Sequence, residues 1–480
     1  SELGQLAMAY AILKGLGAPE EVSSATIDAN SSQVVHSAGC TVSEIKATAD
    51  SLSFIRLDEG IPFNNGIFST MAYRFVPMDQ LNAYRLAVNN LRGGEYTLTV
   101  SGRKIGTYRA ERLADGINIA STTPDAWQPG GPWDAQAISL KSLTEARDEV
   151  NVSARSAGSY IPDSPLIAPL DEQTAIANDQ LVALQRLVAR PRPYQFVLQR
   201  SADQTTITSP KELQVFQRQT RSAGTIRVSG TTTADADSVQ VSFEGQPLEG
   251  QVPGQWPKIS IDPKTGTFDK ELPFPAGGWF SMKLKLEKAG RVVAEQRVDK
   301  FGVGEIFVGA GQSNSTNSGQ FQTKQTSGMV TSFDGEHWQI ADDPQIGVAD
   351  RSQGGSYYPA FGDELYEHYH VPIGIAATGF GGTSVNAWQP SEGLFAHLLT
   401  RLQQLGPHGF RAILWHQGES DVGMTSDEYY EKLQRVIVAT REKAGWDVPW
   451  FVAHVSYHNP ERPSHATTRT AQAKIWADKI

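Results

Sequence analysis

Cysteine is the residue this sequence has least of, and its scarcity excludes several kinds of site. Cys40 is the one cysteine among 480 residues, so neither an intramolecular disulfide nor a cysteine-based zinc site can form. We expect Cys40 to be a small, buried apolar side chain. Cysteine-poor proteins occur in the cytosol and among exported bacterial proteins. The compartment therefore stays open, with a slight preference for an extracellular or periplasmic location.

Long apolar runs and an excess of basic residues are also missing. No stretch reaches the roughly 18 consecutive apolar residues that a membrane-spanning helix needs. We find no signal peptide within these residues, because Ser1 opens directly onto an amphipathic pattern; a chain that begins with Ser can have its true start upstream. The formal net charge is -10. Nucleic-acid binding requires a basic surface, so we expect no nucleic-acid partner.

The remaining composition is that of a globular protein with more than one domain. Hydrophobic residues make up 39% and charged residues 20%, and 480 residues suffice for two to four domains. Apolar side chains at helical spacing predict a docked helix over 2–16. Strand-like runs follow within 61–120, and a helical region follows over 133–189. We therefore assign 1–205 to a mixed helix and strand region. The oligomeric state stays open.

Two further regions have different periodicities. From 206 to 300, alternating strands are separated by turn residues roughly every 8–12 positions, which predicts a β-sandwich of immunoglobulin-like size. From 301 to 480, apolar strands alternate with helical stretches, which is typical of a parallel sheet covered by helices. The predicted fold class is therefore α/β at the C-terminus, preceded by a β-sandwich and a mixed α+β region. Ligands of such sheets bind beyond the carboxyl ends of the strands.

The first strand of 301–480 ends in a motif with a candidate nucleophile. In GAGQSNSTNSG, at 309–319, Ser313 follows the strand directly. A serine on a sharp turn there has an exposed hydroxyl, with backbone N–H groups nearby to hold an oxyanion. A serine in an ordinary polar turn is the plainer interpretation of this motif alone. Dinucleotide binding is a poorer one, because Asn314 replaces the third glycine of the G-x-G-x-x-G pattern.

The next two strands also end in motifs with candidate site residues. TGFGGTSVNAW, at 378–388, contains two adjacent glycines whose N–H groups can face a developing negative charge, although glycine pairs mostly make turns. LWHQGESD, at 414–421, crowds four polar side chains together, namely His416, Gln417, Glu419 and Asp421. The amide of Gln417 can donate to an oxyanion without adding charge. A polar loop at the lip of the core is the alternative.

The order of these motifs at three successive strand ends resembles the SGNH hydrolase superfamily. The most similar branch is the sialate O-acetylesterase-like carbohydrate esterases, which carry G-Q-S-N, G-G-T and H-Q-G-E-S/N-D. Here these motifs stand at 311–314, 381–383 and 416–421. The resemblance implies a serine esterase that removes O-acetyl groups from sialic acid or a polysaccharide through an acyl-enzyme. It implies neither a metal nor a cofactor.

The resemblance also assigns roles to single residues. Ser313 is the nucleophile, and the oxyanion hole consists of its own N–H, the N–H of Gly382 and the side-chain amide of Gln417. Substrate-binding or supporting roles are assigned to Asn314, Thr383, Trp388, His416 and Glu419. Trp388 is expected either to stack on a sugar ring or to cap the core. His416 and Glu419 are expected to orient their loop.

The pattern of the family breaks at its fourth element, D-x-x-H, which supplies the general base and its orienting acid. We expect no functional D-x-x-H after Ser313; His454, His458 and His465 remain near the C-terminal end and are expected to have surface or supporting roles. Residues 2–16 resemble the helix that follows D-x-x-H-P in the family. The chain therefore resembles a fragment of a longer protein with two SGNH units. The alternative function is a catalytically incomplete, carbohydrate-binding protein of the same fold.

Overall fold

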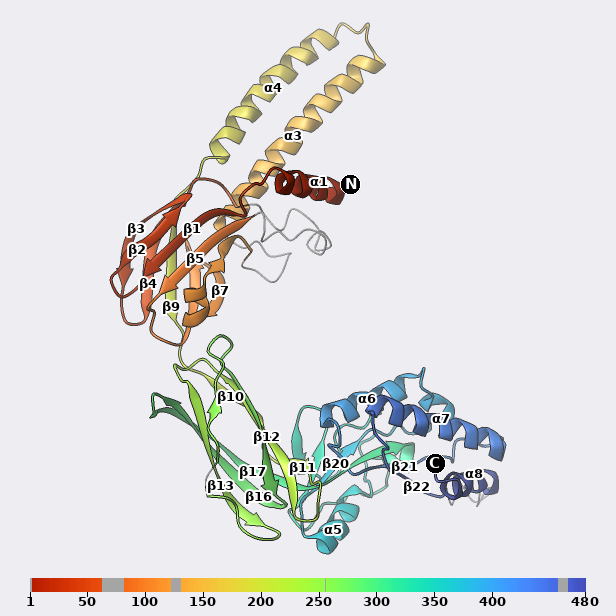
Figure 1. The fold of residues 1–480 in the computed structure, drawn as a ribbon. Coiled ribbons are helices and arrows are strands. Elements are labelled where there is room, and N and C mark those ends of the chain that lie inside the picture. The colour runs from red at the N-terminus through yellow and green to blue at the C-terminus, as the bar shows by residue number, and fades with distance from the viewer. Residues whose placement is uncertain (1, 63–81, 122–130, 255, 456–464) are drawn as a thin grey trace. The chain divides into compact units, whose positions relative to one another are not determined.

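The computed structural model describes residues 2–62, 82–121, 131–254, 256–455 and 465–480. The chain is a mixed α/β protein with several sheets (Figure 1). It divides into two compact units. The first contains the chain up to Gln204 with the short segments 232–235 and 262–266, and the second contains the remainder.

The first unit is built on two sheets that enclose one apolar core. The four-stranded sheet has the order β2 (Gln33–Ala38), β1 (Glu21–Asp28), β5 (Ala83–Asn89) and β8 (Ile117–Asn118). The five-stranded sheet has the order β3 (Cys40–Ala47), β4 (Ser51–Asp58), β9 (Tyr194–Arg200), β6 (Glu95–Val100) and β7 (Arg103–Arg109). Ile27, Leu86 and Phe196 are buried in the shared core. Cys40 is buried, as predicted.

Four α-helices and one short 3₁₀ helix belong to the described part of this unit. They are α1 (Glu2–Gly15), α2 (Ala110–Asp115), η4 (Ile119–Ser121), α3 (Pro132–Tyr160) and α4 (Ile167–Val188). The last two form a long hairpin that extends away from the sheets (Figure 1), joined by hydrogen bonds between the amides of Asn151 and Asn178. The sequence predicts a helix over 2–16 that packs on the rest of the protein through its apolar side chains. Met8 and Ile12 of this helix are instead 60% and 61% exposed, so these two side chains are not packed.

The second unit begins with two sheets that pack on each other. One contains β10 (Thr205–Ser209), β12 (Ala223–Thr232) and β15 (Thr267–Pro275). The other contains β14 (Ile259–Ser260), β13 (Ser238–Pro247), β16 (Gly277–Lys288), β17 (Arg291–Gly311) and β11 (Gln214–Gln217). Apolar residues of both sheets, such as Ile226, Phe268 and Leu284, are buried between them. Exposed polar residues alternate with these apolar positions along the strands, which is the pattern that the sequence predicts.

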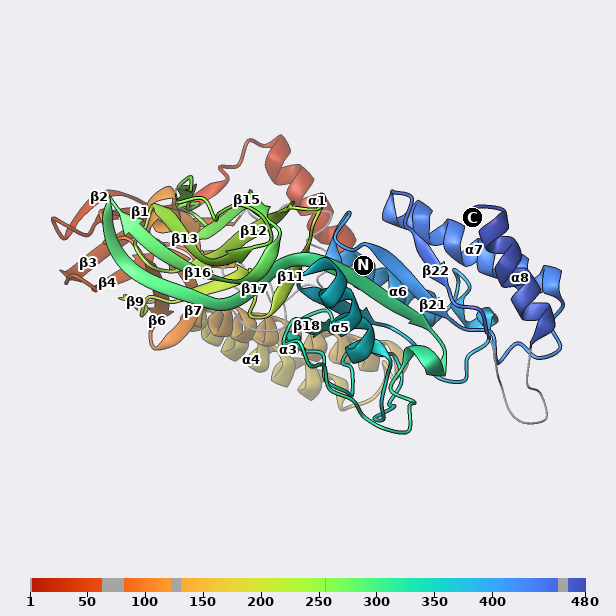
Figure 2. The same cartoon turned by 90° about the horizontal axis from the view of Figure 1, so that it is seen from below.

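Strand β17 continues from this region into the next sheet. Its first part pairs antiparallel with β16, and its last part pairs in parallel with β20 (Ile373–Ala377) and β21 (Ala412–His416). Figure 2 shows it as one long curved strand. The boundary expected between 300 and 301 falls inside this strand. Gly302 and Gly304 lie at the change but do not interrupt the strand, and the burial pattern turns there from mostly exposed residues to a fully buried run over 301–311.

The C-terminal sheet positions the three motifs. Its order is β19 (Trp338–Ile340), β18 (Val330–Phe333), β20, β17, β21 and β22 (Trp450–Val452), and all pairs except β18 with β19 are parallel. Its helices are α5 (Tyr358–Tyr369), α6 (Gly393–Leu405), α7 (Ser426–Ala444) and α8 (Ala466–Ala477). Two separate apolar clusters pack on the sheet, one with Leu398 and Leu433, the other with Tyr358. Because parallel strands end at the same edge, the three motifs share that edge.

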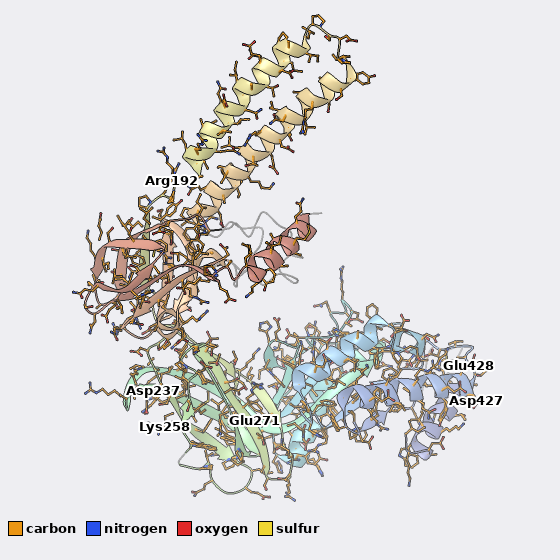
Figure 3. All side chains as sticks on the ribbon, turned by 45° about the horizontal axis from the view of Figure 1, so that its top comes forward. Arg192, Asp237, Lys258, Glu271, Asp427 and Glu428 are labelled. Atoms are coloured by element: carbon orange, nitrogen blue, oxygen red, sulfur yellow. The ribbon has the colours of Figure 1, made fainter. Side chains whose placement is uncertain are left out.

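Helix α7 begins shortly after the third motif and is capped at its first turn. Thr425 accepts from the backbone N–H of Glu428, and the Glu428 carboxylate accepts from the backbone of Thr425, which forms a capping box. Figure 3 labels Asp427 and Glu428 in this first turn, where acidic side chains complement the helix dipole. The cap fixes the position at which the loop after the third motif enters helix α7. Within the described ranges, no helix is both long and apolar enough to cross a membrane.

Candidate active site

The strand register brings the three motifs together. Gly311 of the first motif is the parallel partner of His416 of the third, and Gln312 N donates to His416 O at 2.9 Å. On the other side, Phe380 N of the second motif donates to Gly311 O, also at 2.9 Å. The first motif therefore lies between the other two.

Ser313 lies on the turn that directly follows β17. It opens the short 3₁₀ helix η5 (Ser313–Ser315) and is partly exposed. The turn depends on Gly311, whose φ is +127° and whose Cβ, if present, would lie 2.2 Å from His416 O. Ser315 connects the turn to the end of β17, since its hydroxyl donates to Ala310 O at 2.9 Å. The result is the exposed serine expected from the sequence.

A cleft of about 890 Å³ opens over Ser313. Its polar lining includes Asn314, His416 and His454, and its apolar lining includes Phe321, Phe451 and Trp476. Phe321 is 75% and Trp476 84% exposed. Aromatic rings at a rim offer flat faces to a ligand. The cleft therefore combines a serine hydroxyl, imidazole groups and aromatic surfaces.

The second motif forms a glycine turn against the nucleophile. A Cβ on Gly381 would lie 3.9 Å from the Cα of Ser313. Gly382 has φ +72°, and a Cβ there would meet nothing within 4 Å. Within the described parts of the chain no hydrogen bond engages the Gly382 N–H. The Thr383 hydroxyl donates to Phe380 O at 2.8 Å and closes the turn.

Gln417 of the third motif is fully buried and hydrogen-bonded within the loops. Its Nε2 donates to Thr383 O at 3.0 Å and to the carboxylate of Asp421. Its Oε1 accepts from the hydroxyl of Tyr429 at 2.9 Å. Gln417 is not among the residues that line the cleft. The structure thus brings the third motif to the site, but the side-chain amide of Gln417 is hydrogen-bonded to neighbouring residues. The expected role of Gln417 as an oxyanion donor stays a prediction.

His416 and Glu419 lie beside the residue that follows the nucleophile. Asn314 Nδ2 donates to Glu419 Oε1 at 2.8 Å, and His416 Nε2 lies 3.6 Å from the same carboxylate oxygen. Burial lowers the pKa of the His416 imidazole below its ordinary value, and the Glu419 carboxylate partly offsets this. His416 is therefore neutral near pH 7. A neutral imidazole, a serine hydroxyl and free backbone N–H groups suit acyl transfer.

The comparison with protein families agrees with this chemistry. Residues 303–479 match the family described as carbohydrate esterase, sialic acid-specific acetylesterase. The match confirms the resemblance that the three motifs indicate. A comparison with the curated proteins finds no match.

Several solved structures are similar to parts of the chain. One, a gut microbial diltiazem-metabolizing enzyme, has 23% identity and a TM-score of 0.35 over 42% of this chain and 54% of its own. A carbohydrate acetylesterase from Xanthomonas citri has 20% identity and a TM-score of 0.38 over 57% and 67%. A protein from Arabidopsis thaliana has 18% identity and a TM-score of 0.30 over 36% and 80%. The chain thus spans just over half the length of the first.

Trp388 of the second motif lies in the core. It has no exposed surface and meets Trp415 edge-on, with ring centroids 5.2 Å apart. Its Nε1 donates to the Thr383 hydroxyl at 3.1 Å. Of the two roles considered for Trp388, the structure favours capping the core, because the ring is not available to stack on a sugar.

The three histidines near the C-terminal end differ in their surroundings. His454 is exposed and lines the cleft, His465 is buried, and His458 lies outside the described residues. The expectation that no D-x-x-H follows Ser313 needs a correction, because Asp334 to His337 has this pattern. It forms the turn between β18 and β19, where the His337 side chain is 75% exposed and does not line the Ser313 cleft.

Sequence reasoning missed Asp350, which contacts the second motif directly. Its Oδ2 accepts from Gly381 N at 2.7 Å, and its Oδ1 accepts from Ser352 N at 3.0 Å. Asp350 lies in a loop that ends no strand and carries no motif, so no local signal marks it. Among the described residues, no group of three or more His, Cys, Asp or Glu side chains is placed to hold a metal ion.

Proposed function

We propose that this chain is a serine esterase that removes O-acetyl groups from carbohydrates, with Ser313 as the nucleophile. The observation that carries the proposal is the position of Ser313, which is partly exposed in the cleft and lies beside the Gly381–Gly382 turn and the third motif. The match of 303–479 to a carbohydrate esterase family supports the substrate class. The acetyl ester is one of sialic acid or of a polysaccharide.

The reaction proceeds through an acetyl-enzyme. Ser313 Oγ attacks the acetyl carbonyl and gives its proton to a base. The attack converts the acetyl carbonyl into a tetrahedral oxyanion. Collapse of this intermediate breaks the ester bond, and the sugar oxygen leaves with the proton from the base. Water then attacks the acetyl group on Ser313, and acetate is released. No redox step or co-reactant other than water is required.

Backbone N–H groups stabilise the oxyanion. The N–H groups of Ser313 and Gly382 are the donors, and the unengaged N–H of Gly382 supports this role. Removing one such donor typically costs about 3–4 kcal/mol of transition-state stabilisation. Gln417 joins them when its amide exchanges the hydrogen bond to Thr383 O for one to the oxyanion.

The base is His416. Two described histidines line the cleft, and the lowered pKa of His416 keeps it neutral and able to accept a proton near pH 7. Its Nε2 lies 3.4 Å from Asn314 Nδ2, beside the turn that carries Ser313. The Glu419 carboxylate, 3.6 Å from the same nitrogen, stabilises the imidazolium that forms. This assignment gives His416 and Glu419 more than the orienting role expected from the sequence.

We also propose the finer architecture expected from the sequence. Residues 301–480 form an SGNH hydrolase domain, supported by the parallel strand order and the helices around it. Residues 206–300 form an immunoglobulin-like β-sandwich, supported by the apolar core between two sheets. Residues 1–205 are a separate region, supported by the boundary of the first compact unit at Gln204.

Turnover of p-nitrophenyl acetate and of an O-acetylated sialic acid tests the function. We expect Ser313→Ala to reduce both rates to the background of the assay. Ser318→Ala is the matched control, because Ser318 is an exposed serine that lines the same cleft. Equal rates in the wild type and Ser313→Ala would contradict the proposal. Binding of the acetylated sugar without serine-dependent turnover would instead identify a carbohydrate-binding protein.

A further inference from the structure

We infer that Asp350 is a positioning residue that holds the oxyanion-binding turn in place over Ser313. The inference rests on the proposed esterase function. Asp350 touches no reacting atom; it acts through the backbone of Gly381 and Gly382. Its carboxylate contacts the turn that supplies the Gly382 N–H, and through Ser352 it is connected to the loop that supplies the Ser313 N–H.

The first link runs from Asp350 to the glycine turn. Gly381 N donates to Asp350 Oδ2 at 2.7 Å, and Ala349 N donates to Gly379 O at 2.9 Å. Two adjacent glycines are conformationally permissive, so a Gly–Gly turn left alone samples many directions. The Gly381 carbonyl and the Gly382 N–H belong to one planar peptide unit. The Gly381 N–H that Asp350 holds belongs to the preceding peptide unit, so only the φ and ψ angles of Gly381 are left to set the direction of the Gly382 N–H.

The second link runs from Asp350 to the loop that follows the nucleophile. Ser352 N donates to Asp350 Oδ1 at 3.0 Å. Ser352 Oγ in turn accepts from Asn317 N at 3.0 Å. Asn317 is buried and closes the connection, since its Oδ1 accepts from Gln345 N at 2.7 Å. Asp350 therefore links the glycine turn to the segment four residues beyond Ser313.

The negative charge of Asp350 favours this linking role. Its two oxygens accept from Gly381 N, Ser352 N and the Ser352 hydroxyl. Hydrogen bonds to an ionised acceptor are stronger than neutral ones. Asparagine at this position can accept through one oxygen only, and its NH2 group, which is a donor, would face a backbone N–H, which is also a donor. Asp350→Asn should therefore be intermediate between the wild type and Asp350→Ala, which is a result that a simple space-filling role does not predict.

The chain offers a matched control in Asp363 of α5. Its carboxylate accepts from the backbone N–H of Thr326 at 2.7 Å and of Ser327 at 3.1 Å, as well as from both hydroxyls. Asp363 thus uses the same chemistry to hold a surface loop, but none of these bonds reaches the glycine turn. Asp363→Ala therefore reports the general cost of releasing a loop.

Two measurements on the full chain test the inference. Hydrogen–deuterium exchange should become faster in the peptides covering 379–384 in Asp350→Ala but not in Asp363→Ala. In p-nitrophenyl acetate hydrolysis, kcat should fall by about 10²-fold in Asp350→Ala, as for a lost oxyanion donor, with KM unchanged. The kcat and the exchange rate of Asp350→Asn should lie between those of the wild type and Asp350→Ala. If Asp350→Ala does not fold, Asp350→Asn is measured in its place.

The outcomes separate the inference from the esterase proposal. Unchanged exchange over 379–384 in Asp350→Ala, or equal acceleration in Asp363→Ala, would overturn the positioning role. So would an unchanged kcat in Asp350→Ala when Ser313→Ala is inactive, and that result would leave the esterase function standing. Faster exchange confined to the Asp350 variant would support the positioning role even if wild-type turnover did not depend on Ser313.

Discussion

Asn314 and Glu419, 105 positions apart in the sequence, are joined by a hydrogen bond of 2.8 Å from Nδ2 to Oε1. The bond ties the residue after the nucleophile to the third motif. Asp421 makes a similar link between the third and second motifs, since it accepts from Ser384 Oγ at 2.5 Å and from Val385 N at 3.1 Å. Buried carboxylates thus hold the three motifs as one unit, and their removal gives testable predictions.

Replacing Glu419 by Gln should shift the pH dependence of turnover. Burial lowers the pKa of His416, and the Glu419 carboxylate raises it in part. Without that charge the imidazolium is less stable, so the His416 pKa falls further. As His416 accepts a proton only when neutral, the acid limb of kcat/KM should move to lower pH in Glu419→Gln. A pH–rate profile measures this shift; no movement, or movement to higher pH, would contradict His416 as the base.

Replacing Gly382 by Ala should impair turnover more than stability. A non-glycine residue at φ +72° costs about 1–2 kcal/mol, and no neighbouring atom obstructs the new methyl group. The turn can relax from this strain only by re-aiming the Gly382 N–H. Gly250→Ala is the control, because Gly250 has φ +77° and equally open surroundings. Urea unfolding should show similar losses for both, while only Gly382→Ala should lose kcat.

Replacing Gln417 by Ala should reduce both stability and kcat. The change removes one hydrogen bond from the Asp421 carboxylate, which keeps Ser384 Oγ and Val385 N, and one from the Tyr429 hydroxyl, which keeps the backbone Gln417 O. Each lost bond costs about 1 kcal/mol. Tyr429→Phe removes only the hydroxyl that donates to Gln417 Oε1 and leaves the Gln417 amide hydrogens in place. If the amide joins the oxyanion hole, Gln417→Ala should lose about 10²–10³-fold in kcat beyond Tyr429→Phe. Equal kcat values would make Gln417 purely structural.

Replacing Trp388 should affect stability and not sugar affinity. The side chain is fully buried against Trp415, so Trp388→Ala should lower the free energy of unfolding by about 3–5 kcal/mol. Trp388→Phe fills more of the space and should keep the wild-type KM for an acetylated sugar. A large rise in KM in the Phe variant would indicate that the ring contacts substrate after all.

Local patterns in the sequence predicted the strand ends at which the candidate site residues lie. Ser313 lies in the turn after β17 and Gly382 in the loop after β20, and such apolar strands can be recognised from a short window of residues. The strand register then places both motifs at one edge, with Gly311 opposite His416. The helices α5, α6 and α7 were predictable for the same reason, since each has its own apolar periodicity.

Features that depend on distant partners were not predictable. Asp350 reaches Gly381 across 31 positions, and nothing in its own loop indicates that contact. The burial of Trp388 follows from packing against Trp415, which lies on another strand. β17 runs unbroken from the β-rich region into the parallel sheet, although its composition changes midway. Periodicity identifies elements, but the partners of a side chain are set by the assembled fold.

The most direct test of the central claim is to trap the acetyl-enzyme. The protein is mixed with p-nitrophenyl acetate, quenched rapidly in acid and digested, and the peptide that contains Ser313 is analysed by mass spectrometry. We expect an acetyl group on Ser313 that appears within the first turnover and disappears when substrate is exhausted. Turnover with no acetyl group on Ser313, or with equal labelling of the peptide in Ser313→Ala, would contradict it.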